Sequence, residues 1–192
     1  MATVTDPNSP SDEELMVLVA SGDDIAFRSL VERHQNLVIG TVARMVGPAE
    51  AEDIAQQVFL NVWKSAPRWR PDARFTTWLL TITKRLVFNE SRRRSRARLV
   101  PQSDEERETT DYPDGGQSPD RSLLDDELNR AIEVALSSLP EKERLAVVLR
   151  RYEELPYDEI AVVLGCTLPA VKSLLFRARN SLKEQLAPYL RG

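Results

Sequence analysis

Residues that build disulfides and metal sites are nearly absent from this sequence. Among 192 residues there is one cysteine, Cys166, and one histidine, His34. No internal disulfide can form, and no metal cluster has plausible ligand spacing. We therefore expect a chain without a metal or other cofactor, in which Cys166 is a small buried apolar residue and His34 is an ordinary polar residue of a helix.

Long apolar runs and catalytic motifs are absent as well. The chain has no apolar run of about 18 residues, and its start, MATVTDPNSPSDEE, lacks the basic and apolar segments of a signal peptide. It has no glycine-rich phosphate loop and no nucleophile with a neighbouring base. We expect a cytoplasmic protein that makes no contact with a membrane and is not an enzyme.

Basic charge is concentrated in one stretch. The whole chain has 30 acidic and 26 basic residues, but residues 64–98 contain eleven basic residues and two acidic ones. Trp69, Phe75, Trp78 and Phe88 lie among these cations. Cations that follow phosphates, together with aromatic rings that stack on unpaired bases, are typical of a surface for single-stranded nucleic acid. The alternative is a solvated helix face with a basic end.

The spacing of apolar residues predicts an all-α fold, because they recur at helical intervals along nearly the whole sequence. Asp23 and Asp24 are suited to cap a helix that ends at Gly47. Further helices are expected at about 49–64 and 76–94, with a proline-bounded loop, SAPRWRPDAR, between them. The loop and the second of these helices carry the basic and aromatic residues described above.

Composition divides the chain into two small helical domains. Residues 1–23 contain five acidic residues and no basic one, and we expect a flexible tail there. Residues 24–98 form the first domain. Residues 99–121 are rich in acid, proline, glycine and serine, and predict a flexible acidic linker because they cannot offset the entropy cost of ordering. The second domain covers residues 122–192.

The second domain ends in a predicted helix-turn-helix. A helix at 157–164 is followed by Gly165, which provides a left-handed stop, and by a last helix that begins at Thr167 or Leu168. One face of the last helix is suited to contact phosphates and base edges of duplex DNA. Its residues are Lys172, Ser173, Phe176, Arg179, Asn180 and Lys183, with Arg177 at its flank. The alternative is a plain helical hairpin with solvated charges.

Three stretches occur in an order that points to a known family. They are AEDIAQQVFLNVWK, FTTWLLTITKRLVFNESRRR and LPYDEIAVVLGCTLPAVKSLLFRAR. In order and spacing they resemble region 2 and region 4 of bacterial sigma factors of the extracytoplasmic function (ECF) group. The resemblance covers about residues 24–98 and 122–187. It implies a transcription initiation factor that binds core RNA polymerase, directs it to specific promoters and promotes DNA opening at the minus-10 element.

The resemblance also implies three sets of site residues. The set that docks on core RNA polymerase is Glu52, Asp53, Gln56, Gln57 and Phe59. The set that binds the single-stranded minus-10 element is Arg68, Arg70, Arg74, Thr77, Trp78, Lys84, Arg85, Phe88, Asn89, Arg92, Arg93 and Arg94. The set that binds the minus-35 element as duplex is Lys172, Ser173, Phe176, Arg177 and Arg179. No catalytic residue or metal ligand is implied.

Several positions depart from the family pattern. Gln57 stands where an acid is usual, and Arg85 stands where an Asn is common. In region 4, Pro169 and Ala170 replace Gly-Thr, and Leu174 replaces an Arg, which we interpret as the loss of a phosphate contact. The strength of polymerase docking, the minus-10 base preference and the minus-35 sequence are therefore not carried over from the family.

Two other classes of protein stay open as alternatives. A stand-alone helix-turn-helix regulator explains the second domain but leaves the aromatic residues between 64 and 98 without a role. A helical interaction or sequestering protein explains the acidic surfaces and predicts no DNA contact. For an initiation factor, the expected partners are core RNA polymerase and promoter DNA, and the free chain is expected to be a monomer. An anti-sigma factor is one of several open routes of regulation.

Overall fold

The computed structural model describes residues 9–99 and 119–190. Within these ranges every regular element is helical, which confirms the predicted all-α fold. The elements before the linker are α1 (Asp12–Ala20), α2 (Asp24–Val46), α3 (Ala51–Ser65), the 3-10 turn η1 (Ala66–Arg68) and α4 (Phe75–Leu99). Those after it are α5 (Pro119–Ser138), α6 (Glu141–Arg151), α7 (Tyr157–Leu164), α8 (Leu168–Leu186) and η2 (Ala187–Leu190).

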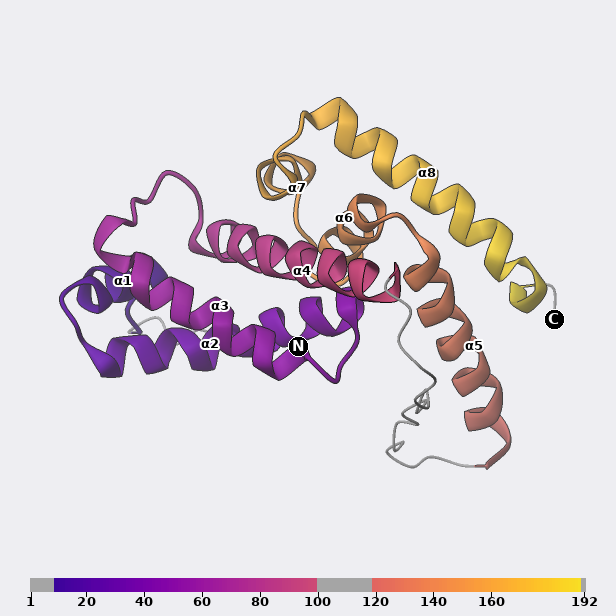
Figure 1. Cartoon of the computed structure of the whole chain (residues 1–192), viewed down its shortest axis with the longest axis horizontal. Helices are drawn as coiled ribbons and strands as arrows, with labels where there is room; N and C mark the ends of the chain where they lie inside the picture. Colours follow the sequence, from indigo (N-terminus) through magenta and orange to yellow (C-terminus); the bar gives the residue numbers. More distant parts are fainter. Residues whose placement is uncertain (1–8, 100–118, 191–192) are drawn as a thin grey trace.

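The long helix α4 lies between two groups of helices (Figure 1). It packs against α2 and α3 on one side and against α7 on the other, while α8 contacts α5, α6 and α7. One cluster of buried apolar side chains continues from α1 to α4 and on into α6, α7 and α8. The two predicted helical domains therefore pack against each other and share an apolar core.

The N-terminal segment differs from the prediction of a flexible tail up to residue 23. Residues Asp12–Ala20 form α1, and Ser11 caps it. The Ser11 hydroxyl accepts a hydrogen bond from the backbone N–H of Glu14, whose carboxylate accepts one from the backbone N–H of Ser11. The prediction is wrong here because this capping box and a short apolar stripe outweigh the acidic composition. The buried stripe is Leu15, Met16 and Val19.

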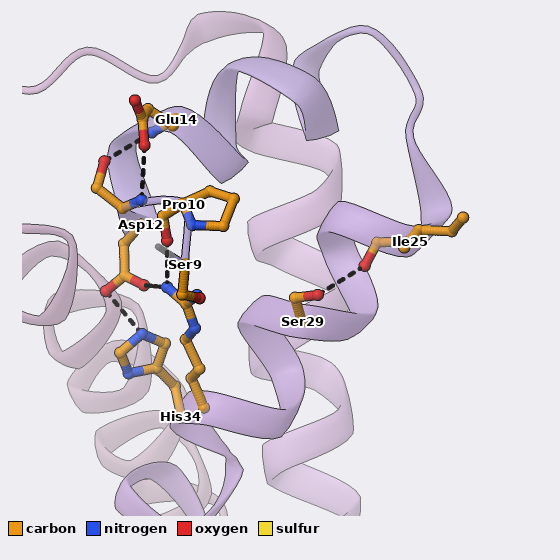
Figure 2. A network of polar contacts seen from close by, with 9 residues as sticks. Ser9, Pro10, Asp12, Glu14, Ile25, Ser29 and His34 are labelled. Atoms are coloured by element: carbon orange, nitrogen blue, oxygen red, sulfur yellow. Dashed lines mark hydrogen bonds and ion pairs between the residues drawn. The ribbon is translucent and has the colours of Figure 1, made fainter. Parts of the chain in front are cut away.

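Asp12 fastens α1 to α2 (Figure 2). One of its carboxylate oxygens accepts a hydrogen bond from Arg33 Nη1 at 3.2 Å, and the other lies 2.8 Å from His34 Nε2. Burial acts to raise the pKa of Asp12, but the hydrogen bonds and charges of His34 and Arg33 outweigh burial and hold the pKa below its ordinary value. His34 is therefore more than an ordinary polar residue, since it helps to hold α1 in place.

Local signals set several other helix ends where the sequence predicts them. The Asp23 carboxylate accepts hydrogen bonds from the backbone N–H groups of Ile25 and Ala26 at 2.8 and 2.9 Å, so α2 begins directly after it. Gly165 has φ 66° and ψ 45°, the left-handed conformation expected at the end of α7. Thr167 caps α8 through its side chain. These contacts confirm the predicted limits of α2, α7 and α8.

The chain between the two parts has more helix than predicted. α4 continues to Leu99 and α5 begins at Pro119, so both ends of the predicted linker 99–121 are helical. The middle of that linker, residues 100–118, lies outside the described residues. Cys166 lies in the turn between α7 and α8 and is predicted to be buried; the structure has it partly buried against the core.

Candidate nucleic-acid and protein interfaces

α7 and α8 form the predicted helix-turn-helix. Tyr157–Leu164 and Leu168–Tyr189 meet at a bend of 96°, which is typical of this motif. Among the residues that the structure describes, no single helix is long and apolar enough to cross a membrane, and these two reach that length and composition only when joined across the bend. The motif is fixed to the rest of the chain by buried side chains. These are Ile160, Val163, Leu164, Val171, Leu174 and Ala178.

The outer face of α8 is open. Lys172 and Ser173 are exposed, and the ring of Phe176 is 64% exposed. Arg177 Nε donates a hydrogen bond to Glu143 Oε1 at 2.7 Å, and Glu143 is buried. That bond orients the guanidinium while leaving more than half of the Arg177 side chain in solvent. The face therefore offers two cations, a hydroxyl and an aromatic ring to a duplex.

Arg179 lies to one side of that face. It lines a groove of about 820 Å³ between α6 and α8. The groove has an apolar floor with cations around it. Its lining is Val147, Arg150, Arg151, Glu154, Tyr157, Leu175, Arg179, Leu182, Lys183 and Leu186. Arg179 is therefore exposed as predicted, but it stands at the border between the open face and this groove.

Leu174 corrects one interpretation of the sequence. Its side chain is 8% exposed and belongs to the apolar cluster shared by the two parts of the chain. The replacement of an Arg by Leu174 predicts the loss of a phosphate contact. That interpretation is wrong for this arrangement, because a side chain at this position points into the core and away from the open face of α8.

α3 presents a row of acidic and amide side chains beside an apolar groove. Glu52, Asp53, Gln56 and Gln57 are exposed, as predicted. Phe59 is buried and contributes to the lining of the groove, so it lies beneath the row of exposed side chains. The groove has a volume of about 510 Å³. Its lining is Phe27, Val31, Gln35, Ile39, Glu52, Ala55, Gln56, Phe59 and Leu60. An apolar centre with a polar rim is typical of a protein interface.

The basic stretch of the first part has an exposed portion on η1 and α4. The exposed residues of the predicted minus-10 set, which also include two in the loop between η1 and α4, are Arg68, Arg70, Arg74, Arg85, Asn89, Arg92 and Arg93. The predicted aromatic residues are less open: the rings of Trp69 and Trp78 meet edge to face with centroids 6.3 Å apart, and Phe88 packs partly against the core. The cations are therefore accessible, while the aromatic rings are partly covered by the chain itself.

α7 contacts three of the predicted minus-10 residues. Thr77 is 1% exposed, and its hydroxyl donates a hydrogen bond to Glu159 Oε2 at 2.6 Å. Arg74 forms an ion pair with Glu159 at 3.2 Å. The Lys84 ammonium donates a hydrogen bond to the backbone carbonyl of Val163. In this arrangement Thr77 is therefore covered and Lys84 is partly covered, while the Arg74 side chain remains 76% exposed.

Arg94 has a structural role that differs from its predicted one. Its guanidinium donates a hydrogen bond to the carbonyl of Val46 and forms ion pairs with Glu50 and Glu90. Arg93 also pairs with Glu90, at 2.8 Å. Arg94 thus ties α4 to the end of α2 and the start of α3, and is not a free phosphate ligand in this arrangement.

Two side chains that make long-range contacts were not identified as such from the sequence. Glu159 and Glu143 stand in the first turns of α7 and α6, where acidic residues are favoured by the helix dipole alone. Because the helix dipole already explains acidic residues at these positions, the sequence does not indicate their contacts with Thr77, Arg74 and Arg177. No group of three or more His, Cys, Asp or Glu side chains within residues 9–99 and 119–190 is arranged to hold a metal ion.

Comparison with known proteins agrees with the geometry. The family model Sigma-70 region 2 matches residues 30–97, and the family model Sigma-70, region 4 matches residues 129–182. The RNA polymerase sigma-H factor of Pseudomonas aeruginosa is 34% identical over 189 residues, which cover 94% of this chain and 96% of that protein. The ECF RNA polymerase sigma-E factor of Escherichia coli is 32% identical over 187 residues, 94% of this chain and 97% of that protein.

Solved structures show the same fold. The structure of CnrH in complex with the cytosolic domain of CnrY has a TM-score of 0.68 and 26% identity, and covers 93% of this chain and 99% of that one. The sigma factor RpoE of Bartonella quintana, solved in complex with the anti-sigma factor NepR, has a TM-score of 0.68 and 22% identity, and covers 84% of this chain and 96% of that one.

The fold, the helix-turn-helix and these matches define a transcription initiation factor. The chain belongs to the ECF group of the sigma-70 family of RNA polymerase sigma factors. It acts by binding core RNA polymerase, directing it to promoters and promoting DNA opening.

Proposed function

We propose that the two parts of the chain divide promoter recognition between them. Residues 24–98 act as region 2, which docks on core RNA polymerase and holds the minus-10 element. Residues 122–192 act as region 4, which holds the minus-35 element. The observation that carries this proposal is the arrangement of exposed groups: an acidic and amide row on α3, a basic row on α4 and an open basic face on α8.

α3 is the proposed docking surface for core RNA polymerase. Glu52 and Asp53 place two negative charges at its first turn, and Gln56 and Gln57 continue the row. The apolar groove beside them, with Leu60 at 55% exposure, supplies the area that a stable contact needs. Phe59 supports this surface from below.

η1 and α4 form the proposed surface for the single-stranded minus-10 element. Arg68 and Arg70 on one side of the loop and Arg85 and Arg92 on α4 are exposed cations that can follow phosphates. The rings of Trp69, Trp78 and Phe88 are partly covered, and their exposed parts can stack on bases of the single DNA strand. Arg74 already lies on this surface, which extends to Thr77 and Lys84 once α7 has moved away from them.

α8 is the proposed reader of the minus-35 duplex, since the second helix of this motif enters the major groove. Lys172, Ser173, Phe176 and Arg177 lie on its open face. Arg177 is held in position by the buried carboxylate of Glu143, so its orientation is set before DNA arrives.

The test of this assignment is charge reversal on α8. We expect Lys172→Glu to lower transcription by about 5- to 150-fold, because one lost phosphate or base contact costs about 1–3 kcal/mol. The measurement is run-off transcription with purified core RNA polymerase, on a promoter that the wild-type holoenzyme selects from a random library. Affinity for core RNA polymerase, measured by isothermal titration, should stay at the wild-type value.

Arg28→Glu is the matched control. Arg28 is exposed on α2, and its reversal changes the net charge of the chain by the same amount as Lys172→Glu. We expect it to retain wild-type transcription. Equal losses in the two variants would indicate a general charge effect, and no loss in Lys172→Glu would remove α8 from the minus-35 contact.

The cellular location and a regulatory partner of the chain can be proposed as well. The chain is proposed to act in the cytoplasm, where core RNA polymerase is found. NepR is the anti-sigma factor bound to the Bartonella relative. A protein partner of that kind is proposed for this chain as well, and binding that competes with core RNA polymerase in a titration would support it, while simultaneous binding of both would count against it.

A further inference from the structure

One end of α7 is held by the start of α4. The Glu159 carboxylate accepts a hydrogen bond from the Thr77 hydroxyl at 2.6 Å with one oxygen, and its other oxygen lies 3.2 Å from Arg74 Nη1. Thr77 is almost fully buried by this contact. A carboxylate with its two oxygens on a hydroxyl and a guanidinium occupies donors that a DNA phosphate would otherwise take.

The other end of α7 is held by the middle of α4. The Lys84 ammonium donates to the carbonyl of Val163 in the last turn of α7, where the helix dipole favours a cation. Burial under α7 lowers the pKa of Lys84, and the nearby charges of Arg85 and Lys142 lower it further. The ammonium is therefore held in this contact and partly withdrawn from solvent.

Between these two ends the contact is apolar. Ile160 and Val163 of α7 are fully buried, and they belong to the same cluster as Phe75, Leu79 and Leu80 of α4. Moving α7 off α4 exposes this surface to water, which opposes the movement. The closed arrangement thus rests on packing as well as on the charged contacts at each end.

A second junction between the two parts supports the first. Arg144 of α6 donates a hydrogen bond to the carbonyl of Met45 in α2 at 2.8 Å. The guanidinium of Arg44 lies over the ring of Tyr152, 4.0 Å from its centroid. α6 is thereby fixed against the end of α2, which keeps the following α7 over α4.

We propose that α7 is an intramolecular block on the minus-10 surface, with the Glu159 carboxylate standing in for a phosphate on Arg74 and Thr77. The block acts on one surface only, since Lys172 and Phe176 on α8 remain exposed in the closed chain. The free protein therefore keeps its duplex-binding face and hides part of its strand-binding face. This inference rests on the proposed role of α4 in holding the minus-10 strand.

The test compares Glu159→Gln with Asp158→Asn in the full-length free protein. Both changes remove one negative charge from the first turn of α7, and Asp158 is exposed. The probe is a single-stranded DNA of about 20 nucleotides with mixed sequence, bound at fixed salt and measured by isothermal titration. Its duplex form is the second probe. Amide hydrogen exchange over residues 75–85 reports whether α7 has left α4.

We expect Glu159→Gln to speed exchange over residues 75–85 and to bind the single strand about three- to tenfold more tightly than the wild type, because the open fraction sets the apparent affinity. Asp158→Asn should stay within about twofold of the wild type in both measurements. Duplex affinity should be the same in all three proteins, since the face of α8 is open in each of them.

Three results would overturn the proposal, and they point to different faults. Unchanged exchange in Glu159→Gln would show that Glu159 does not hold α7, and would leave the proposed role of α4 intact. An equal gain in Asp158→Asn would show a general charge effect. Faster exchange without tighter strand binding would show that α7 opens but that the surface beneath it does not bind DNA, so the proposed role of α4 would fail with the block.

Discussion

Asp12 connects the first helix to the second through a small group of charged contacts. Its carboxylate meets Arg33 and His34 of α2, and Arg33 also donates to the carbonyl of Pro10 at 2.7 Å. α1 is only nine residues long, too short to be stable by itself in water. Its helical state therefore depends on these contacts and on its buried apolar stripe.

We expect Asp12→Ala to release α1 and to lower the free energy of unfolding by about 1–2 kcal/mol, since hydrogen bonds to charged groups are lost. The measurement is amide hydrogen exchange over residues 12–20, which should become fast. Glu13→Ala, an exposed change on the same turn, should keep slow exchange. Similar exchange in the two variants would mean that the helix dipole, and not the contact with α2, holds α1.

This contact has a definite dependence on pH. Because the folded state holds the pKa of Asp12 below its ordinary value, the stability it contributes is present above the pKa of the unfolded chain. It is lost as the pH falls through the lowered pKa of the folded chain. α1 should therefore detach in acid and remain docked at neutral pH.

At the residue scale, the exposed cations could be predicted from the sequence and the covered ones could not. Arg85 and Arg92 are open on α4, as predicted. Thr77 is covered by a carboxylate 82 positions further along the chain, and Arg94 is bound to a carbonyl 48 positions before it. No local pattern encodes contacts over such separations. The family resemblance therefore assigns both side chains to DNA, and nothing nearby in the sequence indicates their intramolecular partners.

The turn between α7 and α8 determines how the helix-turn-helix sits on α4. Gly165 adopts a left-handed conformation there, and a Cβ at this position would lie 4.0 Å from Lys84 Nζ. That distance is an ordinary contact. The cost of a side chain at Gly165 is therefore set by the backbone conformation and not by a clash.

We expect Gly165→Ala to lower the free energy of unfolding by about 1–2 kcal/mol, the cost of an alanine in the left-handed region. Thermal unfolding should show a decrease in Tm of roughly 2–6 °C for a chain of this size. Gly165→Asn should lose less, because asparagine tolerates this conformation better. If the two variants lose the same stability, the left-handed backbone is not the cause.

At the element scale, helix ends with local chemical signals could be predicted. The Asp23 cap, Gly165 and the Thr167 cap are each readable from a few adjacent residues, and the structure has all three. α1 carries such a signal too, the capping box of Ser11 and Glu14, although the acidic composition of this segment predicts a flexible tail. Local capping chemistry was the better guide to helix limits in this chain.

At the scale of the whole molecule, the junction of α2 with α6 holds the carboxylate of Glu153 where its charged form is disfavoured. Glu153 lies directly after α6 and accepts a hydrogen bond from the Thr41 hydroxyl at 3.4 Å. Burial raises the pKa of Glu153, while Arg44 and Thr41 act in the opposite direction without cancelling the effect of burial. The surroundings of Glu153 at this junction therefore disfavour its charged form.

We expect Glu153→Gln to raise the Tm by about one or two degrees at pH 7.5, because it removes this charge and keeps an oxygen for Thr41. A carboxylate with a raised pKa contributes stability below the pKa of the unfolded chain and loses it as the pH rises through the folded pKa. The difference between variant and wild type should therefore shrink at pH 4. The measurement is thermal unfolding at both pH values.

Glu154→Gln is the control for this change, since Glu154 is exposed and next in sequence. It should leave the Tm unchanged at both pH values. A gain in Glu153→Gln that is the same at pH 4 and pH 7.5 would mean that the charge of the carboxylate is not responsible.

The joint packing of the two parts could not be predicted from composition. The two helical domains and the acidic segment between them are visible in the sequence, and such a segment favours independent bodies. The contacts that join them, such as Arg144 with Met45 and Glu159 with Thr77, come from side chains whose local setting explains them equally well as solvated charges. Only the three-dimensional structure distinguishes side chains that join the two parts from side chains that are merely solvated.

All three tryptophans, Trp63, Trp69 and Trp78, lie in the part of the chain before the linker. Trp63 packs against Phe27 of the α2–α3 groove with ring centroids 5.0 Å apart, and Trp78 directly follows the threonine that α7 covers. Indole emission excited at the red edge of its absorption therefore comes from region 2 alone. If α3 docks on polymerase and α7 leaves α4 as proposed, the chain is its own optical probe, and either event should change the colour of the emitted light.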